Sequence, residues 1–316
     1  MKELLTSNLL MVRPVAFRMN EQTAVNNYYQ QENADLTADG VQDTAVKEFD
    51  DLVAKIRAHN IHVTVIEDSI EPSTPDSIFP NNWISFHTDG EVVLYPMFAD
   101  NRRQERREDI QAIMEREGYQ VTEIIDYTDF EDKNMFLEGT GSMVLDRTNG
   151  IAYAAISERT DTDLFQRFCT HFDYKPVVFE AFQPVGNDRL PIYHTNVMMA
   201  LGEKFAVICL DAIDDKKERL AVENSLFESG KEIIELTEKQ LNNFAGNMLQ
   251  VRNKEGKKYL IMSSAAHTSL TNEQLGNIEK YCQINHSPLD TIEELGGGSA
   301  RCMLAEVFLP KLTGDA

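Results

Sequence analysis

Five residues with reactive or hydrogen-bonding side chains recur at nearly even intervals along this chain. They are Asn82, Glu138, His194, Asn247 and Cys302, and successive members are 56, 56, 53 and 55 residues apart. A cysteine, a histidine and a carboxylate that meet can perform nucleophilic catalysis: a thiolate attacks, an imidazole carries protons, and a carboxylate orients the histidine or the substrate. Taken singly, Glu138 also fits an ordinary turn and His194 the end of a strand. The spacing that they share with Cys302 favours the catalytic interpretation.

Cys302 stands between a glycine-rich loop and a short apolar run. Gly296, Gly297 and Gly298 precede it, and residues 303–308 follow with the composition of a buried strand. Glycine has no Cβ, so a ligand or another segment can approach such a loop closely. A thiol at this junction can face a cleft while the strand holds it in place. The alternative is that Cys302 is a small buried apolar residue.

The secondary-structure pattern repeats with the same period. Each unit of about 55 residues has the pattern of a helix, a strand and a hairpin, and five units fill the chain. The helices are predicted at residues 44–59, 103–117, 162–171, 215–228 and 271–282, and the following strands at 61–66, 121–125, 175–179, 232–236 and 289–292. Hairpins are predicted at residues 83–95, 142–156, 196–210 and 248–262.

The two ends of the chain complete this pattern. A first strand at residues 12–17 and a last strand at 303–308 each lack a neighbour, so we expect them to pair with each other. A unit this small cannot bury its own apolar face, and five units packed around an axis form one domain. The sequence therefore predicts an α/β fold of five repeats, as a single domain over residues 1–316. In such a radial array the five evenly spaced residues would converge on the axis.

Composition narrows the classes of function. Of 316 residues 42% are hydrophobic and 26% charged, as in a globular protein with a substantial core. The formal net charge of −22 argues against nucleic acid or an anionic membrane as a partner. No apolar run approaches the roughly 18 residues of a membrane span. Four scattered cysteines, without metal-binding spacing, indicate a reducing cytoplasm. A homodimer is compatible with the sequence.

Several short motifs carry a resemblance to a known family. Residues 75–82, with the sequence PDSIFPNN, are similar to its "PD-x-hydrophobic-F-x-x-D" loop, and residues 136–139, FLEG, contain its "LEG" carboxylate. Residues 157–160, SERT, match its "S-x-R-T", and His194 and Cys302 match its histidine and its C-terminal cysteine. From about residue 75 to 308 the chain resembles the guanidine-modifying (pentein) superfamily, which includes arginine deiminase, dimethylarginine dimethylaminohydrolase and glycine amidinotransferase. The resemblance implies a five-bladed α/β propeller of ββαβ-like repeats, closed by the N- and C-terminal strands.

The resemblance also implies roles for individual residues. Cys302 would be the nucleophile, His194 the proton carrier, and Glu138 a hydrogen-bond partner of the histidine or of the substrate's terminal nitrogens. No metal or other cofactor is implied. The seven histidines have no HxH or HExxH spacing, which further disfavours a metal hydrolase.

The remaining motif residues would bind the two ends of an amino acid. Arg159, together with Arg102 or Arg103, would hold the substrate's α-carboxylate through paired hydrogen bonds. Asp76 would hold its α-amino group. For Arg102 and Arg103 surface ion pairing is a strong alternative, because acidic residues crowd the same segment.

Two amides depart from the family pattern. Asn82 and Asn196 occupy positions where arginine deiminase-like members have aspartates that grip a cationic guanidinium. An asparagine can both donate to and accept from a neutral urea, whereas a buried carboxylate without a cation is costly. This favours a ureido substrate such as citrulline. The alternative is that the amides have no effect on selectivity, since the related succinylarginine dihydrolase has an asparagine in the first loop and accepts a guanidinium.

The sequence therefore predicts a cysteine-dependent hydrolase of non-peptide C–N bonds in a small amino acid. The best interpretation is conversion of citrulline to ornithine, ammonia and carbon dioxide through a covalent Cys302 intermediate. Arginine deiminase and amidinotransferase activities are alternatives within the family. A non-catalytic propeller that binds an amino acid or a protein is the alternative of a different class.

Overall fold

The structure is a computed structural model, and it describes residues 5–30 and 38–312. The α-helices are α1 (Glu21–Ala24), α2 (Ala38–Arg57), α3 (Ile110–Arg116), α4 (Gly139–Ser142), α5 (Thr162–His171), α6 (Thr195–Met198), α7 (Lys216–Glu228), α8 (Glu238–Leu241), α9 (Ser264–Ser269), α10 (Asn272–Glu279) and α11 (Asp290–Gly296). The strands are β1 (Asn8–Arg13), β2 (His62–Glu67), β3 (Ile84–Phe86), β4 (Glu91–Leu94), β5 (Glu123–Asp126), β6 (Val144–Asp146), β7 (Ile151–Ala155), β8 (Lys175–Phe179), β9 (Phe182–Val185), β10 (Asp188–Pro191), β11 (Met199–Leu201), β12 (Phe205–Ile208), β13 (Glu232–Glu235), β14 (Leu249–Arg252), β15 (Lys258–Ser263), β16 (Gln283–Ser287) and β17 (Ala305–Glu306).

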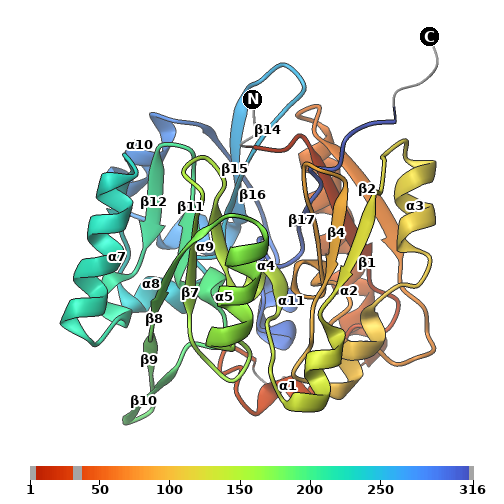
Figure 1. Cartoon of the computed structure of the whole chain (residues 1–316), viewed down its shortest axis with the longest axis horizontal. Coiled ribbons are helices and arrows are strands. Elements are labelled where there is room, and N and C mark those ends of the chain that lie inside the picture. Colours follow the sequence, from red (N-terminus) through yellow and green to blue (C-terminus); the bar gives the residue numbers. More distant parts are fainter. Residues whose placement is uncertain (1–4, 31–37, 313–316) are drawn as a thin grey trace.

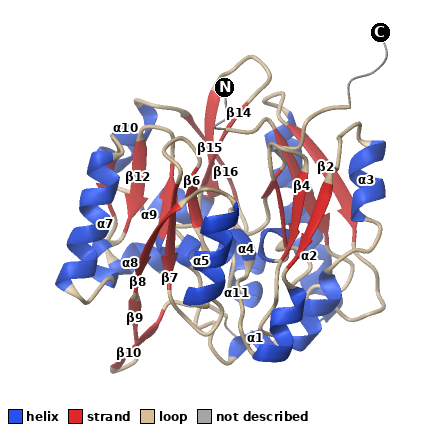
Figure 2. Cartoon of the chain, in the orientation of Figure 1, coloured by secondary structure: helices blue, strands red, loops and turns tan. Residues whose placement is uncertain are grey.

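Five sheets of three strands share one design. Their orders are β17-β1-β2, β3-β4-β5, β6-β7-β8, β11-β12-β13 and β14-β15-β16. In each sheet the first two strands are antiparallel and the third is parallel to the second. In Figure 2 the helices α7 and α3 lie at opposite ends of the view, with strands between them. The five repeats predicted from the sequence are therefore present as units of structure in a mixed α/β fold.

The two ends of the chain form one sheet, as the repeat pattern predicted. Strand β17 pairs with β1 in antiparallel register, with Leu9 opposite Glu306 and Leu10 opposite Ala305 (Figure 1). The predicted bounds of both strands were wrong, because the first lies at Asn8–Arg13 and the last is only Ala305–Glu306. The turn that contains Cys302 extends to Met303, and residues 307–308 follow β17 without regular secondary structure.

Other elements also differ from the sequence prediction, three of them in kind or by several residues at one end. The strand predicted at 289–292 is wrong, because Leu289, Ile292 and Leu295 lie three residues apart and are buried along one side of α11. The strand of that unit is β16, earlier in the chain. The helix predicted at 103–117 begins only at Ile110, because Asp100–Glu105 is a 3₁₀ turn followed by extended backbone at Arg106. The strand predicted from Asn196 begins with the short helix α6, and β11 follows it.

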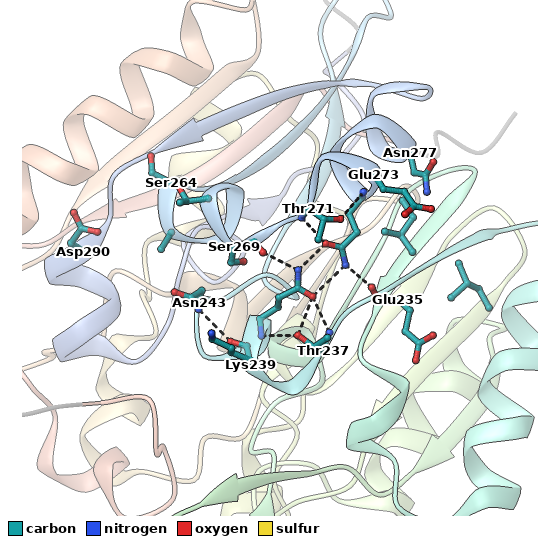
Figure 3. Close-up of a pocket in the computed structure, with 16 residues that line it drawn as sticks. Glu235, Thr237, Lys239, Asn243, Ser264, Ser269, Thr271, Glu273, Asn277 and Asp290 are labelled. Carbon is teal, nitrogen blue, oxygen red and sulfur yellow. Dashed lines mark hydrogen bonds between the residues drawn. The ribbon is translucent and has the colours of Figure 1, made fainter.

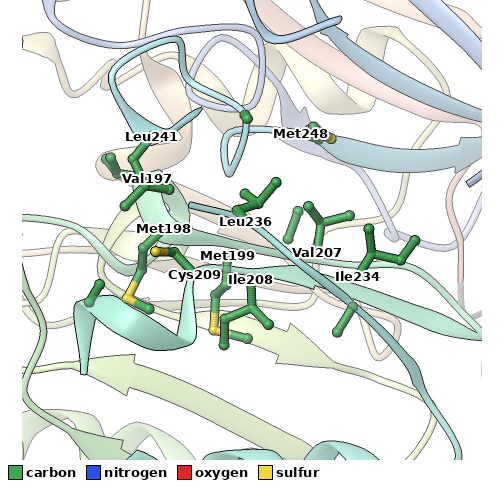
Figure 4. Close-up of a cluster of buried hydrophobic side chains, with 14 of the residues drawn as sticks. Val197, Met198, Met199, Val207, Ile208, Cys209, Ile234, Leu236, Leu241 and Met248 are labelled. Carbon is green, nitrogen blue, oxygen red and sulfur yellow. The ribbon is translucent and has the colours of Figure 1, made fainter. Parts of the chain in front are cut away.

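The helices form where caps and apolar spacing agree. The side chain of Asp161 accepts a hydrogen bond from the Leu164 amide and so begins α5, in which Leu164, Phe165 and Phe168 are buried. The middle strand β12 is buried along its whole length, as expected of a strand covered on both faces. Figure 4 shows the apolar cluster around this sheet, to which α6 contributes Val197 and Met198. These packed sheets provide rigid ends from which the candidate site residues project.

Candidate active site

Cys302 lies in a tight turn between α11 and β17 and is 3% exposed. Its amide donates to the Ser299 carbonyl at 3.0 Å. The preceding glycines pack against the ring of Phe79, and a Cβ on Gly296 or Gly298 would lie 2.8 or 2.9 Å from ring carbons. The glycines are needed because Phe79 fills the space beside them.

Two amide side chains are the hydrogen-bond partners of the Cys302 sulfur. Asn247 Nδ2 lies 3.2 Å from Sγ and Asn196 Nδ2 lies 3.6 Å from it. Asn247 was recognised in the sequence only as one of the five evenly spaced residues, and no role was predicted for it. Its position in the repeat was the available signal.

His194 is paired with Glu138 and not with the cysteine. Its Nε2 lies 2.8 Å from Glu138 Oε2, and both side chains are buried. Burial lowers the pKa of His194 to about 4 even though Glu138 opposes the change. Burial opposes ionisation of Glu138 as well, but Arg159, His194 and Arg102 together lower its pKa to about 2. A carboxylate only accepts hydrogen bonds, so the neutral imidazole carries its proton on Nε2, and Nδ1 is left as an acceptor.

Glu138 is held from the other side by the backbone. The Phe98 amide donates to its Oε1 at 2.9 Å, and the nearest guanidinium nitrogens of Arg159 and Arg102 lie 3.7 and 3.8 Å from Oε2. Gly139 follows with φ of +48°, and a Cβ there would lie 2.3 Å from the Asn81 carbonyl oxygen. The glycine of the LEG motif is therefore required by the close approach of this loop.

Arg102 is fully engaged within the protein. Its guanidinium donates to both oxygens of Glu105, at 2.8 and 2.9 Å, and to Asn82 Oδ1 at 2.9 Å. Burial alone would lower the pKa of Arg102, but the carboxylates of Glu105 and Asp76 hold it above its usual value. The residue lies beside the candidate site, and its donors face protein acceptors.

The bond from Arg102 fixes the orientation of Asn82. A guanidinium has donors only, so Asn82 must present its oxygen to Arg102 and turn Nδ2 the other way. Nδ2 is buried without a hydrogen-bond partner among the described residues. It faces Gly141, where a Cβ would lie 2.3 Å from Asn82 Nδ2 and 2.9 Å from His194 Nδ1. The unpaired donor, Asn82 Nδ2, and the free acceptor, His194 Nδ1, therefore both lie beside Gly141.

The other predicted arginine, Arg103, lies outside this site. It donates to the carbonyls of Met97 and Phe98 at 3.0 and 3.3 Å and pairs with Asp100 near the surface. Of the two candidates for the substrate carboxylate, the structure brings only Arg102 to the cavity.

Asp76 and Arg159 bind a segment that the sequence did not identify. Asp76 Oδ2 accepts from Asn20 Nδ2 at 2.7 Å and from the Thr23 hydroxyl at 3.1 Å. Arg159 donates to Asn26 Oδ1 through Nε at 3.0 Å and to the Thr23 carbonyl through Nη2 at 3.0 Å. The residues predicted to hold an amino acid's α-amino and α-carboxylate groups thus already contact the protein's own polar groups.

The same segment covers the site. Asn27 and Gln30 donate to backbone carbonyls of the glycine loop, Gln30 to Gly296 at 3.2 Å and Asn27 to Gly297 at 3.3 Å. The cavity that remains has a volume of about 10 Å³; it is lined by residues that include Asp76, Asn82, Arg102, Arg159, Tyr193, His194 and Cys302. That space is about the size of one water molecule. Residues 20–30 precede the motifs of the family resemblance, so no sequence signal pointed to them.

A larger hollow lies elsewhere. It has a volume of about 910 Å³ between β13, α8, α9 and α10, and Gln240 and Gln274 bond to each other in it (Figure 3). None of the predicted site residues lines it. In the described part of the chain, no cluster of three or more His, Cys, Asp or Glu side chains is placed to bind a metal ion. Likewise, none of the described helices is long and apolar enough to cross a membrane.

Comparison with known proteins identifies the family and the fold of the chain. The model of the family described as "N,N dimethylarginine dimethylhydrolase, eukaryotic" matches residues 13–309. Apo ArgZ, an arginine dihydrolase from the ornithine–ammonia cycle in cyanobacteria, superposes with a TM-score of 0.73 and 18% identity over 97% of this chain. AgrE in complex with ornithine and NAD+ gives a TM-score of 0.72 and 20% identity over 96% of this chain. No significant match was found among curated protein sequences.

These two relatives are longer proteins, since this chain spans 41% of ArgZ and 39% of AgrE. A variant of dimethylarginine dimethylaminohydrolase, solved as an adduct with S-methyl-L-thiocitrulline, is matched over 99% of its length, with a TM-score of 0.62 and 10% identity. At these identities the likeness to solved structures establishes the fold. Because the family model spans nearly the whole chain as well, this chain belongs to the pentein superfamily of guanidine-modifying enzymes.

Proposed function

We propose that the chain is a cysteine-dependent hydrolase that converts citrulline to ornithine, ammonia and carbon dioxide. The observation that carries the proposal is the unpaired Nδ2 donor of Asn82, which Arg102 holds in one orientation. A ureido group has a carbonyl oxygen that this donor can bind. A guanidinium has donors only and would leave the Asn82 amide unpaired, at a cost of about 1–3 kcal/mol.

The charge around the head group supports the same choice. Asn82 and Asn196, both buried, are neutral where a guanidinium-binding site would have carboxylates. Glu138 is negative, but it is already paired with His194 and lies near Arg159. A neutral urea enters such a site without the desolvation penalty of a cation.

In the proposed reaction the Cys302 sulfur attacks the ureido carbon, and the bond to the δ-nitrogen breaks. The thiol proton passes through the neutral His194, whose Nδ1 is the free acceptor, to the departing amine of ornithine. Glu138 holds the imidazole through Nε2 and stabilises it while it carries the proton. Water then hydrolyses the S-carbamoyl cysteine, which regenerates the thiol and releases carbamate, and carbamate decays to ammonia and carbon dioxide.

The two ends of the amino acid would replace contacts made by residues 20–30. The α-ammonium would take the place of Asn20 and Thr23 on Asp76, and the α-carboxylate the place of Asn26 on Arg159. Because the present cavity of about 10 Å³ cannot hold an amino acid, this segment must move for the substrate to enter.

Arginine is the second candidate substrate. It is favoured by the similarity to ArgZ and AgrE, of which the first is an arginine dihydrolase and the second was solved with L-arginine. With arginine, the same attack on the guanidino carbon would release ammonia and leave an amidino group on the Cys302 sulfur, and water would then hydrolyse this intermediate to citrulline as the first product.

A substrate panel on the purified protein tests the proposal. We expect kcat/KM to be at least about tenfold higher for citrulline than for arginine, with ornithine as the product. The variant Asn82→Asp keeps an acceptor for Arg102 and removes the donor, so it should shift the preference toward arginine. Asn242→Asp, the same change at an exposed position, is the matched control. A wild-type preference for arginine that Asn82→Asp leaves untouched would refute the amide argument.

Cys302→Ser tests the class of function. A hydrolase should lose turnover and retain its fold, whereas a non-catalytic binding protein would show no turnover before the change either.

We also propose that the five sheets are the blades of one five-bladed propeller over residues 1–316. The first strands of neighbouring sheets that lie in contact, β17 with β3, β6 with β11 and β11 with β14, support this arrangement. The cytoplasmic location and the homodimer stay predictions.

A further inference from the structure

Asn247 is fixed at the mouth of the turn that carries Cys302. It is 0% exposed and precedes β14. Its Oδ1 accepts from the Arg301 amide at 2.9 Å, and its Nδ2 lies 3.0 Å from the Asn196 carbonyl oxygen and 3.2 Å from Cys302 Sγ. Three segments of the chain therefore meet at one amide.

The orientation of this amide is determined by its partners. The Arg301 amide can only donate, so it must face the oxygen of Asn247, and the Asn196 carbonyl can only accept, so it must face the nitrogen. One hydrogen of Nδ2 is directed to Asn196, and the other is directed to the Cys302 sulfur. Reversing the amide would break both backbone contacts at once.

The charged groups around Cys302 bond to partners other than its sulfur. His194 is neutral and bonded to Glu138, and Arg301 donates to Glu306 at 2.9 Å and to the Leu304 carbonyl at 2.7 Å. The other titratable groups that line the cavity with the cysteine are Asp76, Arg102, Arg159 and Tyr193. Each of these four bonds to protein atoms other than Sγ: Asp76 to Asn20, Arg102 to Glu105, Arg159 to Asn26 and Tyr193 to the Gly297 carbonyl.

We propose that Asn247 is a catalytic residue that stabilises the thiolate of Cys302 through the hydrogen bond from Nδ2. An N–H donor favours the charged form of the sulfur over the neutral thiol, because the bond is stronger to the anion. It does so without adding a cation, which suits a site for a neutral head group. This inference rests on the proposed role of Cys302 as the nucleophile.

The test is the pH profile of Cys302 alkylation by iodoacetamide, with the modified residue identified by mass spectrometry. In Asn247→Asp an oxygen still accepts from Arg301, but the donor to Sγ is replaced by a negative group. We expect the midpoint of the profile to rise by about one unit or more and the rate constant near neutral pH to fall roughly tenfold or more. The midpoint is compared rather than the amplitude, because access to the closed cavity scales all points of a profile alike.

A second variant and a control separate this effect from loss of structure. Asn247→Ala removes the donor without adding charge, and it should raise the midpoint by a smaller amount in the same direction. Asn253→Asp makes the same chemical change at a buried turn asparagine that bonds to the amides of Glu255 and Lys257, and it should leave the midpoint unchanged. A purely structural Asn247 would lower Tm in both variants and leave the midpoint where it is in the wild type, which would overturn the inference.

The result of the alkylation experiment does not depend on which substrate the protein uses. If Cys302→Ser abolishes turnover and both Asn247 variants keep the wild-type midpoint, the proposed function stands and this inference fails. If Cys302→Ser retains turnover, the proposed function fails, and with it the catalytic role of Asn247, even where the alkylation midpoint moves.

Discussion

Glu293 gives the protein a pH-dependent stability that can be measured directly. It lies in α11, is 6% exposed, and accepts a hydrogen bond from Ser299 Oγ at 2.5 Å. Burial raises its pKa from 4.5 to about 7, although hydrogen bonds from Ser263 and Ser299 oppose the rise, and the charges of Asp290 and Glu48 add to it. The folded protein therefore binds this proton more tightly than the unfolded chain does.

The direction of the effect follows from that difference. The stability that the bound proton contributes is fully present below the unfolded pKa of 4.5 and is lost as pH rises through about 7. The difference of about 2.5 pKa units corresponds to roughly 3 kcal/mol at about pH 8. Glu293→Gln retains an oxygen for the Ser299 hydroxyl and cannot ionise, so it should be free of this loss.

Urea unfolding of both proteins, stepped from about pH 5 to about pH 8, measures the effect. Over this pH range, we expect the difference in free energy of unfolding between Glu293→Gln and the wild type to change by about 2–3 kcal/mol in favour of the variant. Glu223→Gln, which removes the same charge from the exposed side of α7, is the matched control. Its free energy of unfolding should change with pH as that of the wild type does. A constant difference between Glu293→Gln and the wild type at every pH would refute the reasoning.

Two more predictions concern the site. Iodoacetamide should modify Cys302 before the other thiols, because burial raises the pKa of Cys169 to about 12 and those of Cys209 and Cys282 to about 11; even labelling of all four, read by mass spectrometry, would argue against it. Gly141→Ala should lower kcat by roughly 100-fold, because the added Cβ would displace the amide of Asn82 and the ring of His194. Gly276→Ala, where a Cβ meets nothing within 4 Å, should keep wild-type kinetics, and equal activity of the two variants would contradict the role of Gly141.

Elements whose signals are local could be predicted from the sequence. The helix α5 (Thr162–His171) and the strand β8 (Lys175–Phe179) have the bounds that were expected. For α5, the cap at Asp161 and the apolar spacing after it both lie within one short stretch of chain. The strand predicted at 289–292 failed because two apolar residues, Leu289 and Ile292, fit the inner side of a helix as well as they fit a strand.

The sequence pointed to several residues that the structure brings close together, but not to the hydrogen bonds that they make. The repeat brought Glu138, His194 and Cys302 to notice, and the structure pairs the first two. The orientation of the Asn82 amide, with Nδ2 toward Gly141, depends on Arg102, a residue twenty positions later, and no spacing rule connects them. Arg102 and Arg103 were equivalent candidates in the sequence, and only the fold of the 3₁₀ turn at Asp100–Glu105 separates them.

The contacts of residues 20–30 with the site could not be predicted from the sequence. Its polar side chains have no motif, and they bind partners far away in sequence: Asn20 reaches Asp76, and Asn26 reaches Arg159. These contacts match the groups of an amino acid in kind, with donors on the carboxylate and acceptors on the guanidinium. Under the proposed function, opening the segment for a substrate would therefore exchange one set of hydrogen bonds for another, so that Asp76 Oδ2 and the Arg159 guanidinium have partners in both the free and the occupied protein.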